Sequence, residues 1–316
     1  AGSGKSALAK KVVKDKGYVL FARAEQFVSA DSLNSIWNLD LHSLLKHVPN
    51  TKIYIVIDAL EFIADKSQRY NLLMQLYDLA RRYVNITIIT TCRTSDRSGF
   101  LQLESNYDVQ CFEVGLISPQ ELDDISSEFE TIKIIRKTGQ YSQLLRFPFY
   151  INIIIRNNIN TDDIVDQNSF RELIYSKIIC LNNKAVEYGI PNEDITSVVH
   201  EITFKRAKEF LLGVHKEELK SNVVKALISE GVIIEKDDRI RLCYDIFEDI
   251  VFEHEFDKQF VNCKGDYNVF YDTINTFGRC VYRRYQIWIA NKLFIKESRD
   301  KFIYHLLFSF FNNRQR

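Results

Sequence analysis

The sequence predicts an α/β fold, in which a parallel β-sheet with helices on both faces is followed by mainly helical domains. Through the first third of the chain, apolar runs of strand length alternate with amphipathic helical segments. This alternation is typical of parallel strands joined by right-handed crossovers. The runs are rich in Ile and Val without interruption, as in strands that are covered on both faces. A glycine-rich turn opens the chain and leads directly into a helical segment.

The expected elements follow from these patterns in order. Gly17 ends the first helix, and a short apolar run, YVLFARA, follows it as a strand. The run IYIVID is a buried strand that ends in an acid, and leucines at helical spacing mark the next helix. We expect helices at 6–16, 33–47 and 68–83, and strands at 18–24, 53–58, 86–92 and 109–114.

The opening turn has the pattern of a phosphate-binding loop. Gly4, Lys5 and Ser6 match the second half of G-x-x-x-x-G-K-[ST], and the first glycine of that motif would lie before Ala1. We therefore expect a fragment that begins inside the Walker A loop, without the strand that feeds it. Backbone N–H groups of such a turn converge on a phosphate, assisted by the helix dipole. The residues expected to bind the nucleotide here are Gly2, Ser3, Gly4, Lys5, Ser6 and Ala7.

This loop implies ATP or ADP with Mg²⁺ as the cofactors. Lys5 would reach the β- and γ-phosphates, and the Ser6 hydroxyl would bind Mg²⁺. The alternative is a flexible Gly/Ser segment that spells the motif by chance.

Polar residues follow two of the expected strands, at the sheet edge where ligands bind in such folds. Asp58 ends one strand, where an acid would hold Mg²⁺ together with Ser6. Glu61 would orient or deprotonate the attacking water. Arg93 follows the next strand and would stabilise charge on the γ-phosphate. Without the loop upstream, the acids would be solvated loop residues and the arginine part of a surface salt bridge.

Composition limits the partners. The chain has 42 basic and 42 acidic side chains, so no global charge attracts nucleic acid or an anionic membrane. No uncharged apolar run reaches the 18 residues of a membrane span. The nearest cysteines, Cys263 and Cys280, are 17 residues apart, which excludes a CxxC metal or redox motif. We read all six cysteines as reduced thiols of a cytoplasmic protein.

The second part of the chain is predicted to be helical with one β-hairpin. Long helices are expected at 168–189 and 193–212. A further helix at 216–230 precedes two short strands that flank a Lys-Asp-Asp turn, the pattern of a hairpin. Beyond residue 266 aromatic residues recur at helical spacing, interleaved with Arg279, Arg283 and Arg284. Such residues can form a nucleic-acid surface, but helical aromatic spacing more often indicates a core.

Five motifs occur in order: GSGKSALAK, FARAEQF, VIDALEFIAD, TTCR and FEVGLISPQEL. Together they resemble the STAND class of P-loop NTPases, which includes NACHT and NB-ARC proteins, and within it the bacterial antiviral AVAST-type ATPases. The resemblance covers roughly residues 1–255. It implies a P-loop NTPase core at 1–117, a helical lid domain at 118–213, a winged-helix domain at 214–262 and an α-helical extension at 263–316.

The resemblance also assigns two residues outside the core. LLRFPFYINII looks like the motif whose proline packs on the adenine, which would be Pro148, with Phe147 beside it. Many relatives have a histidine that touches the β-phosphate where this chain has Tyr244. A tyrosine donates one neutral hydrogen bond and cannot carry the imidazolium charge, so contact with ADP would be weaker. His254, ten residues further on, reads as a surface histidine.

The function implied is a signal-transduction switch that binds ATP, hydrolyses it slowly and controls ligand-triggered oligomerisation in bacterial antiviral defence. Its expected partners are further copies of itself, in a tetramer or ring, and a protein trigger sensed by a C-terminal region missing from this chain. Membranes and nucleic acid are not expected as partners. Two alternatives remain: a nucleotide-holding scaffold with little turnover, and an initiator-like ATPase that loads on DNA through the winged helix.

Overall fold

The computed structural model describes residues 2–27, 30–48, 50–63, 67–137, 143–159, 167–209, 211–264, 266–277 and 279–294. The chain divides into two units, Ala1–Asn158 and Ile159–Arg316. The boundary between them falls inside the segment expected to form the helical lid. Each unit has its own sheet, and each is described separately below.

The first unit contains a parallel sheet, as predicted, which holds three of the four expected strands. Its strands are β1 (Tyr18–Arg23), β2 (Ile53–Asp58) and β3 (Ile86–Thr90), in the order β1-β2-β3. The first residues of the three strands are aligned: Tyr18 of β1 lies opposite Ile53 of β2, and Ile53 lies opposite Ile86 of β3. The central strand β2 is the most deeply buried of the three. The α/β class is therefore confirmed for this unit.

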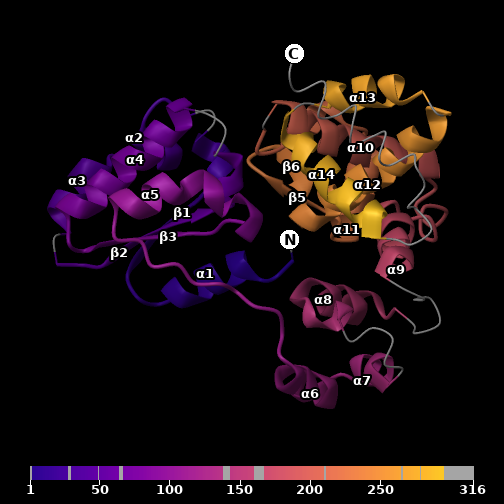
Figure 1. The fold of residues 1–316 in the computed structure, drawn as a ribbon, viewed down its shortest axis with the longest axis horizontal. Helices are drawn as coiled ribbons and strands as arrows, with labels where there is room; N and C mark the ends of the chain where they lie inside the picture. The colour runs from indigo at the N-terminus through magenta and orange to yellow at the C-terminus, as the bar shows by residue number, and fades with distance from the viewer. Residues whose placement is uncertain are drawn as a thin grey trace. The chain divides into compact units, whose positions relative to one another are not determined.

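Helices cover both faces of this sheet (Figure 1). On one face, Ala9 and Val13 of α1 pack against Val56 of β2. On the other face, Ile55 and Ile57 contact a larger core built by the remaining helices. The alternation of neighbouring β2 side chains between the faces is what extended backbone requires. The helices are α1 (Lys5–Val13), α2 (Leu33–Trp37), α3 (Leu41–His47), α4 (Ser67–Arg82) and α5 (Leu101–Asn106).

The single helix expected at 33–47 is wrong, because the backbone breaks between two helices. Asn38 adopts a left-handed conformation with φ 49° and ends α2. The Asp40 carboxylate then caps α3 by accepting hydrogen bonds from the N–H groups of His42 and Ser43. Asn and Asp favour such positions because their side chains bond to nearby backbone. Local capping chemistry therefore overrides the apolar periodicity.

The strand expected at 109–114 is also wrong. This segment is in neither helix nor strand, and Phe112 is 84% exposed. A strand needs a neighbour for its N–H and C=O groups. In the described part of the chain the sheet has the order β1-β2-β3, and this segment pairs with none of its strands.

The rest of the first unit is helical: α6 (Pro119–Glu128), α7 (Glu130–Lys137), a 3₁₀ turn (Leu144–Arg146) and α8 (Pro148–Asn157). Ser118 and Glu121 form a capping box before α6, and Pro119 occupies its first turn. A proline likewise opens α8, where its missing N–H costs nothing.

The second unit combines helices with a small antiparallel sheet. Its strands β4 (Val214–His215), β5 (Ile233–Lys236) and β6 (Arg239–Leu242) lie in the order β4-β6-β5. The predicted hairpin is confirmed as β5 and β6. Asp237 and Asp238 form its two-residue turn with φ 52° and 56°, as a type I′ turn requires.

The helices of this unit include α9 (Gln167–Leu173), α10 (Asn192–Glu209), α11 (Ser221–Ser229), α12 (Asp245–Asn262), α13 (Tyr267–Thr276) and α14 (Arg279–Phe294). Short turns lie at Ile174–Ile179, which is π-helical, and at Lys216–Glu218, which is 3₁₀. The long helix expected at 168–189 is therefore wrong beyond the π-helical turn, where Leu181 adopts φ 52°. Among the described helices, none combines the length and apolar character of a membrane span.

The aromatic residues near the end of the described chain form a core, as the simpler interpretation predicted. Phe256, Phe270, Tyr285 and Trp288 are buried together where α12, α13 and α14 meet. Arg284 belongs to this interior, with a side chain only 6% exposed. It therefore adds nothing to the basic nucleic-acid surface considered above.

Buried charges join three helices of this unit. The Glu248 carboxylate of α12 forms ion pairs with Arg206 of α10 and Arg284 of α14. Arg284 also donates to Asp249 at 2.7 Å and lies over the ring of Phe252. The side chains of Arg206, Glu248 and Arg284 are each at most 6% exposed.

Candidate nucleotide-binding site

Two glycines with left-handed backbone shape the turn at the start of the chain. Gly2 and Gly4 adopt φ 83° and 84°, a left-handed conformation that glycine enters without strain. The helical hydrogen bonds of α1 begin with Leu8 N–H, which donates to the Gly4 carbonyl at 2.9 Å. The N–H groups of Lys5, Ser6 and Ala7 therefore have no acceptor within the helix. These donors and the positive end of the helix dipole suit an anion.

The loop serine lies directly against the acid at the end of β2. Ser6 Oγ donates a hydrogen bond to Asp58 Oδ1 at 2.8 Å, although the two residues are 52 positions apart. Asp58 is only 4% exposed. The two residues predicted to bind Mg²⁺ are thus brought together by the packing of α1 on β2.

A third residue, which the sequence interpretation missed, fixes this carboxylate. Thr91, just after β3, donates from Oγ1 to the same oxygen of Asp58 at 2.5 Å. The Thr91 hydroxyl in turn accepts the Ala59 N–H at 3.0 Å. The hint in the sequence was a threonine directly after a buried strand, at the edge where the site residues gather. Thr91 therefore orients Asp58 toward the loop serine.

The other two predicted catalytic residues form an ion pair. Arg93 Nε donates to Glu61 Oε1 at 3.1 Å, and both side chains are 13% exposed. Glu61 lies in a 3₁₀ turn (Leu60–Phe62) that follows the left-handed Ala59. Arg93 precedes a second 3₁₀ turn, Thr94–Phe100. Among the described residues, Glu61 Oε2 is buried without a hydrogen-bond partner.

Lys5 and Glu61 both affect the pKa of Cys92, which lies just after β3. Burial raises the pKa of the Cys92 thiol, the Glu61 carboxylate raises this pKa further, and Lys5 opposes the rise. The Lys5 ammonium itself donates to Ser3 Oγ at 3.3 Å, across the loop. Charges of both signs therefore converge on the carboxyl edge of the sheet.

The predicted adenine-contacting residue lies beside the loop. Pro148 Cγ is 3.9 Å from the position that a Cβ atom on Gly4 would occupy. The neighbouring Phe149 N–H donates to the Gly2 carbonyl at 3.3 Å. The start of α8 therefore borders the glycine-rich turn.

Tyr244 belongs to the second unit, and its contact with the nucleotide stays a prediction. It precedes α12 and packs its ring edge-on against Phe247. His254, expected at the surface, is only partly exposed: it stacks on Tyr175 at 3.8 Å and pairs with Glu172 at 3.5 Å.

The oxygen atoms of Ser6 and Asp58 suit a Mg²⁺ ion that takes its other ligands from water and phosphate. They do not suit a metal ion whose ligands all come from the protein. Mg²⁺ usually takes one or two protein oxygens, and water and phosphate oxygens complete its shell. In the described residues, no cluster of three or more His, Cys, Asp or Glu side chains could hold a metal by itself. A hydroxyl and a carboxylate 2.8 Å apart at the phosphate-binding loop match the first arrangement.

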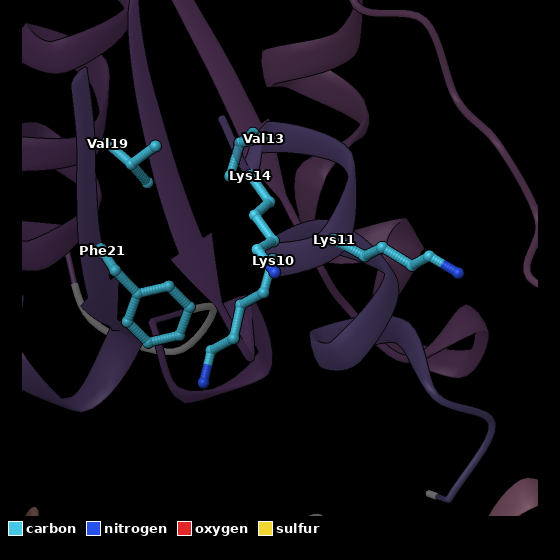
Figure 2. Close-up of a pocket in the computed structure, with 6 residues that line it drawn as sticks. All are labelled: Lys10, Lys11, Val13, Lys14, Val19 and Phe21. Carbon is cyan, nitrogen blue, oxygen red and sulfur yellow. The ribbon is translucent and has the colours of Figure 1, made fainter. Parts of the chain in front are cut away.

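A separate hollow lies at the far end of α1 (Figure 2). It has a volume of about 550 Å³. The Lys10 ammonium lies 4.5 Å from the centre of the Phe21 ring. The residues that line it are Lys10, Lys11, Val13, Lys14, Val19 and Phe21. None of them belongs to the candidate site, which lies at the beginning of the helix.

Comparison with known proteins gives no family for this chain. No protein-family model matches it, and no curated protein is similar to it at a significant level.

Proposed function

We propose that the chain is the ATP-binding module of a signalling switch of the P-loop NTPase type. The observation that carries the proposal is the hydrogen bond from Ser6 in the loop to Asp58 at the end of β2. This contact places a hydroxyl and a carboxylate oxygen beside backbone N–H groups at a helix start. That combination suits a triphosphate with its magnesium ion.

Each site residue then has a role that its position supports. The turn from Gly2 to Ala7 holds the phosphates, and Lys5 adds charge at the β- and γ-positions. Bound Mg²⁺ would supply positive charge at the same phosphates, next to Ser6 and Asp58. Glu61 orients the attacking water, Arg93 contacts the γ-phosphate, and Pro148 packs on the adenine. Catalysis would be slow, because the Glu61–Arg93 ion pair must open before Arg93 can contact the γ-phosphate.

The larger functional context is proposed on the sequence resemblance alone. It comprises a helical lid, a winged helix with Tyr244 facing the β-phosphate, and ligand-triggered self-assembly in bacterial antiviral defence. The Glu61–Arg93 ion pair also favours a second candidate, a scaffold that holds nucleotide with little turnover. Single-turnover hydrolysis of bound ATP separates the two: the switch hydrolyses it and the scaffold retains it.

Replacing Lys5 tests the proposed site directly. Lys5→Ala in the intact protein should weaken Mg·ATP binding by about 10- to 100-fold, the range for a charge-assisted hydrogen bond. Lys10→Ala is the matched control, because Lys10 lies on the same helix and covers Phe21 instead of the loop. Isothermal titration calorimetry measures the affinities, and melting curves check that both variants fold. Equal ATP affinity in the two variants would contradict the proposal.

A further inference from the structure

The two charged side chains that the proposed mechanism needs are bound to each other. Arg93 Nε and Glu61 Oε1 are 3.1 Å apart, in surroundings that leave each side chain 13% exposed. Water screens such a pair less than it screens a fully exposed one. The ion pair is therefore a contact that any competing ligand must displace.

Backbone hydrogen bonds hold the two segments that carry this pair. Leu60 N–H donates to the Thr91 carbonyl at 2.8 Å, and Thr91 N–H donates to the Ile57 carbonyl at 3.0 Å. The backbone carbonyl of Arg93 accepts a hydrogen bond from the Asp96 N–H at 2.9 Å. The pair can therefore open by rotation of the long arginine side chain, without movement of either strand.

The Arg93 guanidinium is suited to one alternative partner, a phosphate. Guanidinium groups bind carboxylates and phosphates with the same planar fork of donors. The Glu61 Oε1 lone pair that accepts the Arg93 hydrogen bond cannot accept one from an attacking water at the same time. Arg93 thus competes with the water for Glu61 while the pair is closed.

We propose that Arg93 is a clamp on Glu61 that opens only when a terminal γ-phosphate takes over the guanidinium. This inference rests on the proposed nucleotide site. A diphosphate has no γ-phosphate and leaves the ion pair closed. Glu61 thereby opposes the binding of triphosphate but not of diphosphate, which makes the ion pair a discriminator between the two nucleotides.

A double-mutant cycle on equilibrium binding tests the clamp. The intact protein, Glu61→Gln, Arg93→Ala and the double variant are titrated with Mg·AMP-PNP and with Mg·ADP. Glu61→Gln should bind the triphosphate analogue about tenfold more tightly, an effect between those of exposed and buried charge-assisted pairs. Its affinity for ADP should not change. In the Arg93→Ala background, Glu61→Gln should change neither affinity.

Controls separate the clamp from general effects of charge and folding. Glu104→Gln breaks the neighbouring Arg97–Glu104 ion pair, which is 2.9 Å long, and should leave both affinities unchanged. Arg93→Lys serves as a second background if Arg93→Ala melts early. A clamp is refuted if Glu61→Gln leaves the analogue's affinity unchanged, or raises it equally in the arginine variants. In either case Lys5→Ala would still weaken binding of the nucleotide, so the proposed site would stand. If Lys5→Ala had no effect on nucleotide affinity, both the site and the clamp would be overturned.

Discussion

The hydroxyl of Thr91 should be one of the most important single groups in the first unit. It donates to Asp58 Oδ1 at 2.5 Å and accepts the Ala59 N–H at 3.0 Å, and Thr91 is 8% exposed. Thr91→Val keeps the shape of the side chain and removes both bonds. One bond involves a charged acceptor, worth about 1.5–3 kcal/mol, and the other is neutral, worth about 0.5–1.5 kcal/mol. We therefore expect a loss of about 2–4.5 kcal/mol in the free energy of unfolding.

Urea unfolding followed by circular dichroism measures this loss. Thr87→Val is the matched control, because it makes the same chemical change at an exposed position of β3, the strand that Thr91 directly follows. It should shift the free energy of unfolding by no more than about 0.5 kcal/mol, as is usual at the surface. If Thr91→Val were as mild as Thr87→Val, the Thr91 hydroxyl would not hold Asp58, and the orienting role given to it here would be incorrect.

Three further predictions concern the nucleotide. Asp58→Asn should weaken ATP binding in the presence of Mg²⁺ but not with EDTA, because it removes the metal-facing charge; titrations in both buffers check this. Glu61→Gln should slow hydrolysis by about 10²–10⁴-fold, the range for loss of a general base, in a single-turnover assay; a normal rate would remove the water-activating role. Tyr244→His should retain ADP longer at pH 6 than at pH 8, because a histidine with an ordinary pKa of about 6.5 is cationic only at the lower pH. Identical ADP off-rates at the two pH values would mean that residue 244 does not face the phosphates.

The sequence predicted β2 to the residue because all the necessary information is local. A short Ile/Val-rich run that ends in Asp58 is typical of a strand buried on both faces, and β2 spans the predicted 53–58. The hairpin of β5 and β6 was equally clear, since Asp237 and Asp238 suit its turn. The segment at 109–114 is partly apolar and was predicted as a strand too, but a strand also depends on a neighbour elsewhere in the chain. Composition alone cannot supply that neighbour.

The candidate site shows the same limit. Ser6, Asp58, Glu61 and Arg93 were predicted one by one from their positions after strands and in the loop. The shared Mg²⁺ implied that Ser6 and Asp58 lie close together, but the ion pair between Glu61 and Arg93 was not predicted, because it depends on which strand ends lie side by side. Thr91 was missed for that reason: its role appears only when the end of β3 lies beside that of β2. Parallel register converts residues 33 positions apart into hydrogen-bonded neighbours.

The buried charges around Glu248 have a mechanical consequence. One carboxylate on α12 is shared by Arg206 of α10 and Arg284 of α14. Separating α12 from both α10 and α14 would leave the buried Glu248 carboxylate without either counter-ion, at a cost of about 3–5 kcal/mol. The sequence predicts these helices in three different domains, yet all three are joined through ion pairs at the same carboxylate, that of Glu248. We therefore expect α10, α12 and α14 to move together as one rigid body in any conformational change of the second unit. The α-helical extension, to which α14 belongs, should move with them.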